Sequence, residues 1–567
     1  MSDIQPTFSQ NRDTDFDVIV VGAGFAGLML LHRLRGLGLR VKVFEAGDNV
    51  GGTWYWNRYP GARCDVESIE YSYSFSEELQ QEWQWSERYA GQPEILRYIN
   101  HVADRFDLRR DIALETYVKR ARFNPDQKRW TVQTSTGQPV TARFCIMATG
   151  NLSKARIPDI PGIETFAGKW FHTSAWPKEP VDFTGLRVGV VGTGSTGIQA
   201  IPKIAAQAKH LYVFQRTANY CIPLRNTTQD RQIESDIKGR YAQLRKQARE
   251  SPSGVAAFNV PTQSALDVTA QEREAAFQQR WDWGGIGLTR AFNDVIFNEE
   301  ANRTASEFVI RKMREVVRDL KVAQALTPTY PIGTKRLCAD TGYYETFNRD
   351  NVTLVDIKST PIQFIGPSTV TTTEASYEVD TLVFATGFDA MTGTLLAIDI
   401  GVEGGPTLQS LWADGPHAYL GVMIAGLPNL FIVTGPGSPS VLSNVVVSIE
   451  QHVEWITDCL NHMRARGHDH IDANPEAQRA WGEHVSEVAN RSLLGQASSW
   501  YTGANIPGKP RVFMPYMGGV GVFRAHCDEV ARDGYRGFVL TGRVPTMPPE
   551  LRLAKASRED QDTSTIA

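Results

Sequence analysis

A short apolar run followed by a glycine-rich turn occurs twice in this chain of 567 residues. The first run, Asp17 to Val21 (DVIVV), precedes GAGFAG, and the second, Arg187 to Val191 (RVGVV), precedes GTGSTG. Both runs are rich in β-branched residues, as expected for central parallel strands that are covered on both faces. Each turn is followed by a helix-like pattern. The chain therefore predicts two units that begin with a strand, a tight turn and a helix.

Further apolar runs predict the other strands of these units. They lie at residues 41–44, 143–149, 211–214, 381–384 and 429–434, and residues 113–142 alternate in the manner of a hairpin. Helical periodicity is found at 92–106 and 445–466, and also at 230–250, 270–281 and 300–325. The last three ranges lie in a stretch rich in Gln, Arg, Glu and Ala. We interpret this stretch as a helical insertion that walls the site between the two units.

The first glycine-rich turn has the composition of a dinucleotide-binding turn. Gly22, Gly24 and Gly27 allow a tight turn, close approach of the backbone to a pyrophosphate, and packing of the helix on the strand. The next strand ends in Glu45, 23 residues after Gly22. An acid at this position accepts hydrogen bonds from the ribose hydroxyls of an adenosine. The first unit therefore predicts an adenine dinucleotide site.

A loop at residues 51–65, GGTWYWNRYPGARCD, follows this unit directly. It combines two glycines and a Pro-Gly turn with several aromatic side chains. Aromatic area of this kind packs against a flat surface, which is either an isoalloxazine ring or a neighbouring domain. A disulfide reductase would need a cysteine pair close to this point, where Trp54 and Tyr55 stand instead.

The second unit differs from the first at the end of its second strand. Gln215, Arg216 and Thr217 occupy the place that Glu45 has in the first unit. A carboxylate would repel a 2′-phosphate at this position, whereas an arginine pairs with it. We therefore expect FAD in the first unit and NADPH, rather than NADH, in the second. An ordinary surface charge at Arg216 is the alternative.

Together these patterns predict an α/β fold with two Rossmann-like dinucleotide-binding domains, one for FAD and one for NADP, and an α-helical insertion. The expected boundaries give disordered tails at 1–15 and 553–567, a discontinuous FAD-binding domain at 16–150 and 380–552, an NADP-binding domain at 151–225 and 330–379, and the insertion at 226–329.

Composition narrows the partners of the protein. The net charge is −4, so there is no basic surface for nucleic acid. Residues 1–15 are polar and unlike a signal peptide, and the apolar run at 18–31 is too short to span a bilayer. The six cysteines are dispersed, without C-x-x-C or metal-ligand spacing. We expect a cytoplasmic protein with reduced cysteines, no metal and no membrane contact.

The segment FAGKWFHTSAWP joins the two units and contains Phe166, Gly168, His172, Trp176 and Pro177. Its order, F-x-G-x-x-x-H-x-x-x-W-P, resembles the fingerprint of type I Baeyer–Villiger monooxygenases; an ordinary interdomain linker is the alternative. Related flavin enzymes that oxidise nitrogen or sulfur usually carry Tyr or Phe in place of the tryptophan. The spacing Gly52-x-Trp54, Tyr59-Pro60-Gly61 and Asp65 resembles a second pattern of the same family.

The resemblance extends from about residue 16 to about residue 542. The segments YPIGTKRL, GPGSPS and SSWYTGANIPGKPRVFMPY are most similar to the phenylacetone monooxygenase branch of the family, since the cyclohexanone branch lacks the GPGSPS form. Two positions depart from that branch. Val441 is β-branched where a smaller side chain is usual, and Asn151 stands where a longer amide is common. Both departures leave the substrate range open.

The resemblance implies an NADPH- and O2-dependent monooxygenase that converts aryl-aliphatic ketones such as phenylacetone, and also cyclic or bulky ketones, to esters or lactones. In such enzymes NADPH reduces FAD, and O2 then gives a peroxyflavin that attacks the ketone to form a tetrahedral adduct. A fixed cation beside the flavin serves this chemistry. The match gives this role to Arg336, with Asp65 as its partner. The alternatives are a flavin monooxygenase that mainly oxidises sulfur or nitrogen, and a FAD- and NADPH-binding protein without turnover.

The resemblance also implies roles for the remaining residues. Lys335, Arg216 and Thr217 are expected to hold the 2′-phosphate. Trp500 is expected to close over nicotinamide and substrate, and His172 to act in domain movement. The ketone pocket is expected to include Ser440, Val441 and Leu442. We expect a monomer whose partners are a small ketone and O2, and whose cofactor-binding residues are Gly22, Gly24, Phe25, Gly27, Glu45, Thr53, Trp54, Asp65, Tyr71, Gly192, Thr193, Gly194, Ser195, Gly197, Arg216, Thr217, Lys335, Arg336 and Trp500.

Overall fold

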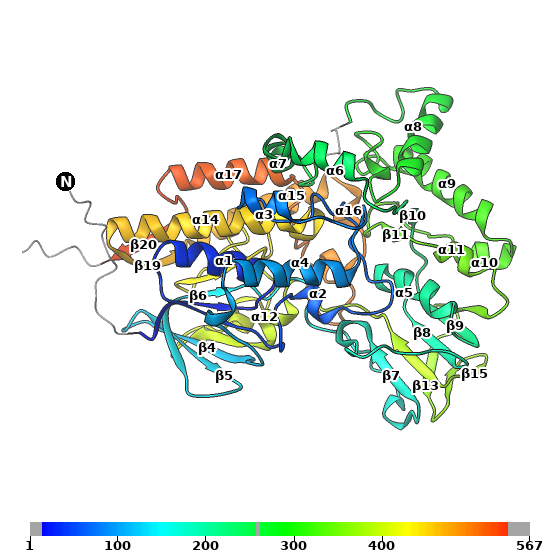
Figure 1. The fold of residues 1–567 in the computed structure, drawn as a ribbon, viewed down its shortest axis with the longest axis horizontal. Helices are drawn as coiled ribbons and strands as arrows, with labels where there is room; N and C mark the ends of the chain where they lie inside the picture. Colours follow the sequence, from blue (N-terminus) through cyan, green and yellow to red (C-terminus); the bar gives the residue numbers. More distant parts are fainter. Residues whose placement is uncertain (1–13, 257–260, 543–567) are drawn as a thin grey trace, which may run out of the picture.

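The structure, a computed structural model, describes residues 14–256 and 261–542. Two sheets occupy opposite ends of the molecule, the first on the left of Figure 1 and the second at its lower right. The expected tails lie outside the described residues, except for Thr14 and Asp15. The carboxylate of Asp15 accepts hydrogen bonds from the backbone and hydroxyl of Thr141, both at 2.8 Å. These two residues are therefore attached to the first sheet.

The first sheet has eight strands in the described chain, in the order β17-β4-β5-β6-β1-β2-β3, with β18 beside β6. Its central strand β1 lies parallel to β2 and β6, which align Val20 with Val43 and Ile146. Val18, Ile19 and Val20 are fully buried, as the apolar run predicted. The bounds are β1 (Phe16–Val21), β2 (Val41–Phe44), β3 (Ile112–Ala113), β4 (Val118–Asn124), β5 (Arg129–Thr134), β6 (Val140–Met147), β17 (Asp399–Val402) and β18 (Leu430–Ile432).

The second sheet has five parallel strands in the order β12-β9-β8-β16-β7. A three-stranded antiparallel sheet, β13-β14-β15, follows β12 in the chain. The bounds are β7 (Lys169–His172), β8 (Arg187–Val191), β9 (His210–Gln215), β12 (Val352–Asp356), β13 (Ile362–Ile365), β14 (Thr369–Thr372), β15 (Ser376–Glu378) and β16 (Thr381–Phe384). The first sheet is mixed, because β5 runs antiparallel to β4 and β6, and the second is fully parallel. Each sheet has one dinucleotide turn after a central parallel strand, which confirms the predicted fold class.

Strand β16 changes the expected boundary between the two domains. The sequence places the return to the first domain at residue 380, but β16 pairs with β7 and β8 in the second sheet. The chain therefore returns to the first unit only after residue 384. A buried parallel strand has an apolar run on either sheet, so its composition does not show which neighbours it will have. The fingerprint segment likewise forms β7, the edge strand of the second sheet, rather than a simple connector.

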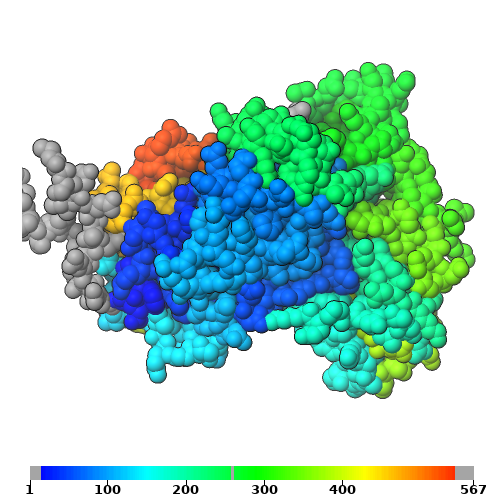
Figure 2. Space-filling view, viewed as in Figure 1, coloured from blue at the N-terminus to red at the C-terminus, as the bar shows by residue number. Residues whose placement is uncertain are grey.

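The predicted insertion is helical but does not stand apart as a separate body. Phe277 and Phe308, with ring centroids 5.6 Å apart, pack in a cluster that also takes in Ile222 of the second unit. Met313 instead joins the core of the second unit, and the hydroxyl of Tyr241 donates to the carbonyl of Ile69 in the first. Figure 2 shows the green residues of this region against both the blue and the yellow-green parts. Its helices are α6 (Arg231–Lys238), α7 (Tyr241–Glu250), α8 (Ala270–Trp283), α9 (Glu299–Val316) and α10 (Leu320–Ala325).

The remaining helices mostly cover the two sheets, and the long helix α14 runs beside α1 over the first (Figure 1). The side chain of Asn444 caps α14 by accepting from the backbone of Val446. No helix in the described ranges has the length and apolar character to cross a membrane. The bounds are α1 (Phe25–Gly36), α2 (Thr53–Trp56), α3 (Glu77–Glu82), α4 (Gln92–Arg105), α5 (Ser195–Ala205), α11 (Tyr343–Thr346), α12 (Gly393–Ala397), α13 (Leu408–Leu411), α14 (Val445–Arg466), α15 (Pro475–Asn490), α16 (Leu493–Gln496) and α17 (Val520–Arg532), with strands β10 (Cys221–Pro223), β11 (Cys338–Asp340), β19 (His468–Ala473) and β20 (Phe538–Gly542).

Asp472 in β19 makes folding stability depend on pH. Both its carboxylate oxygens accept from the backbone N–H of Gly426, at 3.1 and 3.2 Å, and burial raises the pKa of Asp472 to about 7. The folded protein keeps this proton where the unfolded chain has lost it, so stability falls as the pH rises from about 4 to about 7. We expect Asp472→Asn to melt like the wild type at about pH 4 and at a higher temperature than the wild type at about pH 8.

Thermal melts at the two pH values test this expectation. Asp469→Asn is the matched control, because Asp469 pairs with Lys128 on the surface at 2.8 Å and has no comparable buried position. An identical difference between Asp472→Asn and wild type at both pH values would remove Asp472 as the source of the pH dependence.

Candidate active site

A cavity of about 1600 Å³ lies between the two dinucleotide turns and is lined by both. The carboxyl ends of β1 and β8 lead into it, as expected for ligand sites of open parallel sheets. The lining also includes the aromatic loop and the segments around residues 330–336, 441–445 and 497–505. Among the described lining residues the chain passes from Asn219 to Thr329. No helix of the insertion therefore lines this cavity, contrary to our expectation, and only Thr329, the last residue of the expected range, reaches it.

The first turn has the shape that a pyrophosphate requires. Gly22 has φ +105°, and a Cβ there would lie 2.5 Å from the carbonyl oxygen of Ala148. A Cβ on Gly27 would lie 1.8 Å from the carbonyl oxygen of Gly22, so the helix packs directly on the turn. Gly24 and Phe25 line the cavity, and Phe25 begins α1. These residues fit the diphosphate of a dinucleotide at the N-terminus of a helix.

Glu45 lies at the end of β2 and faces the same turn. Its carboxylate accepts from the backbone N–H of Ala23 at 2.7 Å and from that of Gly47 at 2.8 Å. Burial raises the pKa of Glu45, and these hydrogen bonds oppose the rise. The carboxylate is thus held at the cavity wall, where it can accept from ribose hydroxyls. This arrangement fits an adenosine.

The aromatic loop provides one flat wall of the cavity. The indole N–H of Trp54 donates to the hydroxyl of Tyr71 at 3.2 Å, and the two rings meet edge to face. Thr53, Trp54 and Tyr71 all line the cavity. The hydroxyl of Tyr59 donates to Gln199 on α5 at 2.9 Å and so links the loop to the second unit. The wall fits a flat ring such as isoalloxazine.

The second turn repeats the geometry of the first. Gly192 has φ +108°, and a Cβ there would lie 2.5 Å from the carbonyl oxygen of Ala385. A Cβ on Gly197 would lie 2.2 Å from the carbonyl oxygen of Gly192. The Thr193 hydroxyl donates to the carbonyl of Thr217 at 3.0 Å. Gly194 and Ser195 complete the turn, line the cavity and begin α5.

Four cationic side chains line the end of the cavity beside this turn: Arg156, Arg216, Lys335 and Lys358. Burial and the neighbouring charges of Arg216 and Lys358 lower the pKa of Lys335. Burial and the charge of Arg216 likewise lower the pKa of Arg156. All four residues face the cavity, which is a setting for a multiply charged anion such as a 2′-phosphate.

The sequence identified Arg216 and Lys335 but missed Arg156 and Lys358. Lys358 had a usable signal, because it follows β12, and the carboxyl ends of parallel strands meet at one edge of a sheet. Arg156 lies in an irregular segment after β6 and carried no such signal.

Arg336 and Asp65 form the ion pair that the resemblance implied. Arg336 donates from Nε to Oδ2 at 2.9 Å and from one terminal nitrogen to Oδ1 at 2.8 Å. Its other terminal nitrogen donates to the carbonyl of Val441 at 2.8 Å. Burial alone would lower the pKa of Arg336, but the charge and hydrogen bonds of Asp65 raise it above its ordinary value. The guanidinium is a fixed positive charge on the cavity wall.

The three predicted ketone-pocket residues differ in position. Val441 lines the cavity. Ser440 is fully buried behind it, with φ +40°, and accepts a hydrogen bond from Asn151 at 3.3 Å. Leu442 packs with Tyr501 in an apolar cluster. Their shared 3-10 turn brings only one of the three side chains into the lining, which consecutive numbering did not reveal.

Trp500 lines the cavity, whereas the fingerprint residues do not. Trp500 lines the cavity at the start of a short 3-10 turn and packs beside Tyr501, with ring centroids 4.4 Å apart. The five fingerprint residues lie outside the described lining, although Ser174 and Ala175 between them belong to it.

The fingerprint residues are instead packed within the second unit. Phe166 is buried in its core, Trp176 packs on Phe183, and a Cβ on Gly168 would lie 2.3 Å from the carbonyl oxygen of Asp380. Pro177 ends the segment. His172 is within 2.7 Å of the Ser174 hydroxyl and 3.3 Å of the Thr386 hydroxyl, and burial lowers its pKa.

Comparisons with known proteins agree with this geometry. The family described as pyridine nucleotide-disulphide oxidoreductase matches residues 19–279. A Baeyer-Villiger monooxygenase of Pseudooceanicola batsensis is 41% identical over 540 residues, 94% of this chain and 98% of its own. A phenazine N-monooxygenase of Lysobacter antibioticus is 41% identical over 94% of this chain and 98% of its own. A solved steroid monooxygenase bound to NADP is 52% identical, with a TM-score of 0.89 over 93% of this chain and 99% of that one.

Proposed function

The chain belongs to the Baeyer–Villiger monooxygenases, which use FAD, NADPH and O2 to convert ketones to esters or lactones, and we propose that its preferred substrates are aryl-aliphatic ketones such as phenylacetone. Cyclic and bulky ketones are further substrates in this proposal. The observation that supports ketone oxygenation is the fixed cation Arg336 on the wall of a cavity that both dinucleotide turns share.

Bound FAD supplies hydride acceptance and the activation of dioxygen. The protein supplies charge and orientation. Arg336 keeps its charge at neutral pH because Asp65 raises its pKa, and the bidentate contact fixes the plane of the guanidinium. We propose that this charge stabilises the negative charge that develops on the ketone oxygen. The contact with the Val441 carbonyl ties the cation to the ketone side of the cavity.

The two dinucleotides are assigned by the charge at each turn. Glu45 favours the ribose hydroxyls of FAD in the first unit, whereas Arg216, Lys335 and Thr217 favour the 2′-phosphate of NADPH in the second. Arg156 and Lys358 extend this cationic group. We propose that Trp500 covers nicotinamide and ketone, because it lines the cavity from a loop between α16 and α17.

The apolar part of the lining supports a substrate with an aryl group. Val441 and Trp500 pack with Leu152, Ala390 and nearby methionines on one side of the cavity. An aryl ring buries a large apolar area against such a surface, whereas the single carbonyl needs only one charged partner. This arrangement favours a ketone whose aromatic end points away from Arg336.

A substrate panel tests the proposed preference. Phenylacetone, cyclohexanone, a steroid methyl ketone and methyl phenyl sulfide are compared by kcat/KM for the oxygenated product. We expect phenylacetone to exceed each of the others by about tenfold, which corresponds to about 1.4 kcal/mol of differential binding. A steroid or cyclic ketone preferred by a similar factor would overturn the aryl-aliphatic assignment and leave the reaction class unchanged.

Nitrogen oxidation is the second candidate, because one relative of equal identity is a phenazine N-monooxygenase. Phenazine added to the same panel tests this candidate. The Trp176-Pro177 end of the fingerprint favours ketone oxidation. If phenazine N-oxide forms faster than any ester, nitrogen oxidation becomes the first candidate function and ketone oxidation the second.

We also propose that the protein is a cytoplasmic monomer. All six cysteines are free and buried, which supports a reducing location. Three of the most exposed large apolar side chains, Trp283, Leu320 and Val522, come from three separate elements, α8, α10 and α17. Size-exclusion chromatography with light scattering tests the monomer directly.

A further inference from the structure

Residues 70–74, which follow the aromatic loop after residues 66–69, contact other elements on two sides. Tyr71 lines the cavity and accepts from Trp54, and the hydroxyl of Tyr73 donates to the carbonyl of Phe25 at 2.6 Å. Phe25 begins the helix after the first dinucleotide turn, and its ring contacts both tyrosines. The odd-numbered side chains of this segment therefore belong to the flavin side of the structure.

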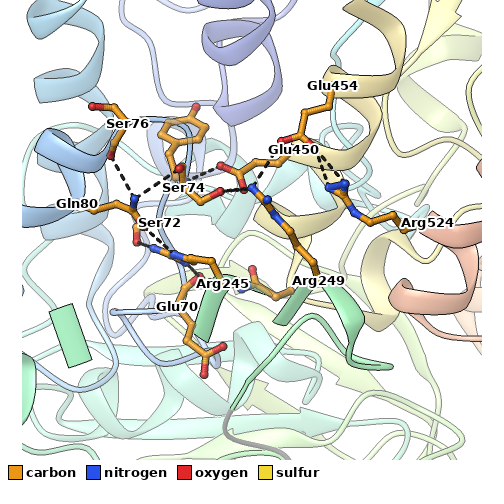
Figure 3. Close-up of polar contacts among 12 residues, drawn as sticks. Glu70, Ser72, Ser74, Ser76, Gln80, Arg245, Arg249, Glu450, Glu454 and Arg524 are labelled. Carbon is orange, nitrogen blue, oxygen red and sulfur yellow. Dashed lines mark hydrogen bonds and ion pairs between the residues drawn. The ribbon is translucent and has the colours of Figure 1, made fainter. Parts of the chain in front are cut away.

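The even-numbered residues of the same segment contact two arginines of α7, as Figure 3 shows. Arg245 donates to the carbonyl of Glu70 at 3.1 Å and to the hydroxyl of Ser72 at 2.6 Å. Arg249 donates to the hydroxyl of Ser74 at 2.8 Å. The segment leaves a hydrogen-bonded turn at residues 67–71, and its two sets of contacts come from different elements. Helix α7 holds the even-numbered residues, whereas the aromatic loop and α1 hold the two tyrosines.

A buried carboxylate completes this contact from the side of α14. Glu450 accepts from the backbone and the hydroxyl of Ser74, each at 2.5 Å, and lies 4.0 Å from Arg249. Burial raises the pKa of Glu450, while the Ser74 hydrogen bonds and the charge of Arg245 oppose that rise. On the far side, Arg249 lies 3.6 Å from Glu454, which pairs with Arg524 (Figure 3).

Arg245 is buried and makes hydrogen bonds to three different residues. Its residue is only 8% exposed, and a third hydrogen bond joins its Nε to Gln80 at 3.0 Å. A buried guanidinium is retained where its directional hydrogen bonds fix several groups at once. The described cavity lining contains no residue of α7, so these arginines have no direct contact with the cofactors.

We propose that Arg245 and Arg249 are positioning residues for the flavin wall of this monooxygenase. By fixing Glu70, Ser72 and Ser74, they set the position of Tyr71 and Tyr73 on the opposite side of the segment. Helix α7 of the insertion thereby shapes a cavity that it does not line. This inference rests on the proposed flavin site, but not on the identity of the ketone.

Loosening the segment admits water to the flavin wall and diverts the reaction. In the coupled reaction, NADPH, H⁺, O2 and the ketone give NADP⁺, water and the ester. Without coupling, NADPH, H⁺ and O2 give NADP⁺ and hydrogen peroxide, and the ketone is released unchanged. Both equations balance, and their ratio is measured as peroxide formed per NADPH consumed.

The test compares Arg245→Met with the matched control Lys246→Met on the same helix. Lys246 has a side chain that is 76% exposed and lies 3.9 Å from Glu250. In the FAD-loaded Arg245→Met protein we expect the peroxide fraction to rise about tenfold, the flavin absorption bands to shift, and the KM for ketone to change little. Lys246→Met should match the wild type in all three measurements. A folded Arg245→Met protein with wild-type coupling and flavin bands would overturn the proposal.

Ser72→Ala keeps the proposal testable if Arg245→Met does not fold. It removes the same hydrogen bond from the other side, and combining it with Arg245→Lys should give less than the sum of the two single effects. Additive effects, or unchanged flavin bands in Ser72→Ala, would contradict the positioning role. The flavin bands and the peroxide fraction without ketone remain measurable even if the substrate assignment is wrong, so the two failures are distinguishable.

Discussion

Replacement of Arg336 by alanine is expected to lower ester formation by about 10²–10³-fold while NADPH still reduces the bound flavin. The guanidinium is a fixed charge on the ketone side of the proposed site, and its removal withdraws stabilisation from the ketone oxygen only when negative charge develops there. Hydride transfer to the flavin has no such requirement, and the cationic group around Arg216, which we propose to bind NADPH, is unchanged. The variant should therefore keep flavin reduction by NADPH and lose most of the ester formation.

Anaerobic stopped-flow reduction and product chromatography measure the two halves in turn. Arg336→Lys is the informative companion, because lysine keeps a positive charge but lacks the bidentate fork that meets Asp65. We expect it to retain flavin reduction and recover only part of the ester yield. Ester formation at the wild-type rate in Arg336→Ala would remove Arg336 from the mechanism.

Replacement of Arg216 by alanine should raise the KM for NADPH by about 10–100-fold and leave the KM for NADH nearly unchanged. A charge-assisted hydrogen bond to a phosphate contributes about 1.5–3 kcal/mol, which corresponds to that range. NADH has no 2′-phosphate, so the variant should lose the preference for NADPH rather than gain activity with NADH. Steady-state kinetics with both cofactors measure the ratio.

Lys209→Met provides the control for Arg216→Ala. Lys209 is an exposed cation directly before β9 and does not line the cavity. It should leave both KM values unchanged. Equal loss with NADPH and NADH in Arg216→Ala would mean that the residue supports the fold of the turn instead of reading the phosphate. Arg156→Met then becomes the next variant to examine.

Local patterns were sufficient to predict both dinucleotide units. Within each unit, the apolar runs, the glycines and the residue that ends the second strand are close in sequence. Their pattern can therefore be recognised without knowledge of distant contacts. The sheet that contains β16 was not predictable in this way. Its pairing with β7 and β8 depends on residues about 190 to 210 positions away, and its buried composition would suit either sheet.

Beyond the two dinucleotide turns, the candidate site was predictable only for residues that match the family motifs. It placed Arg336 opposite Asp65, 271 positions apart, which spacing alone does not show. It did not show that Ser440 and Leu442 turn away from the cavity, because the backbone at Ser440 has positive φ. Arg245 carried no sequence signal at all. An arginine in a polar helix predicts a solvated face, and only the packing of α7 on residues 70–74 buries it.

The most direct test of the proposed reaction is the yield of ester per NADPH in isotopically labelled dioxygen, with FAD-loaded protein and phenylacetone. We expect one ester for each NADPH above the ketone-free background, with one labelled oxygen atom in each ester. NADPH consumption that gives hydrogen peroxide and no labelled product from any ketone of the panel would contradict the proposed reaction.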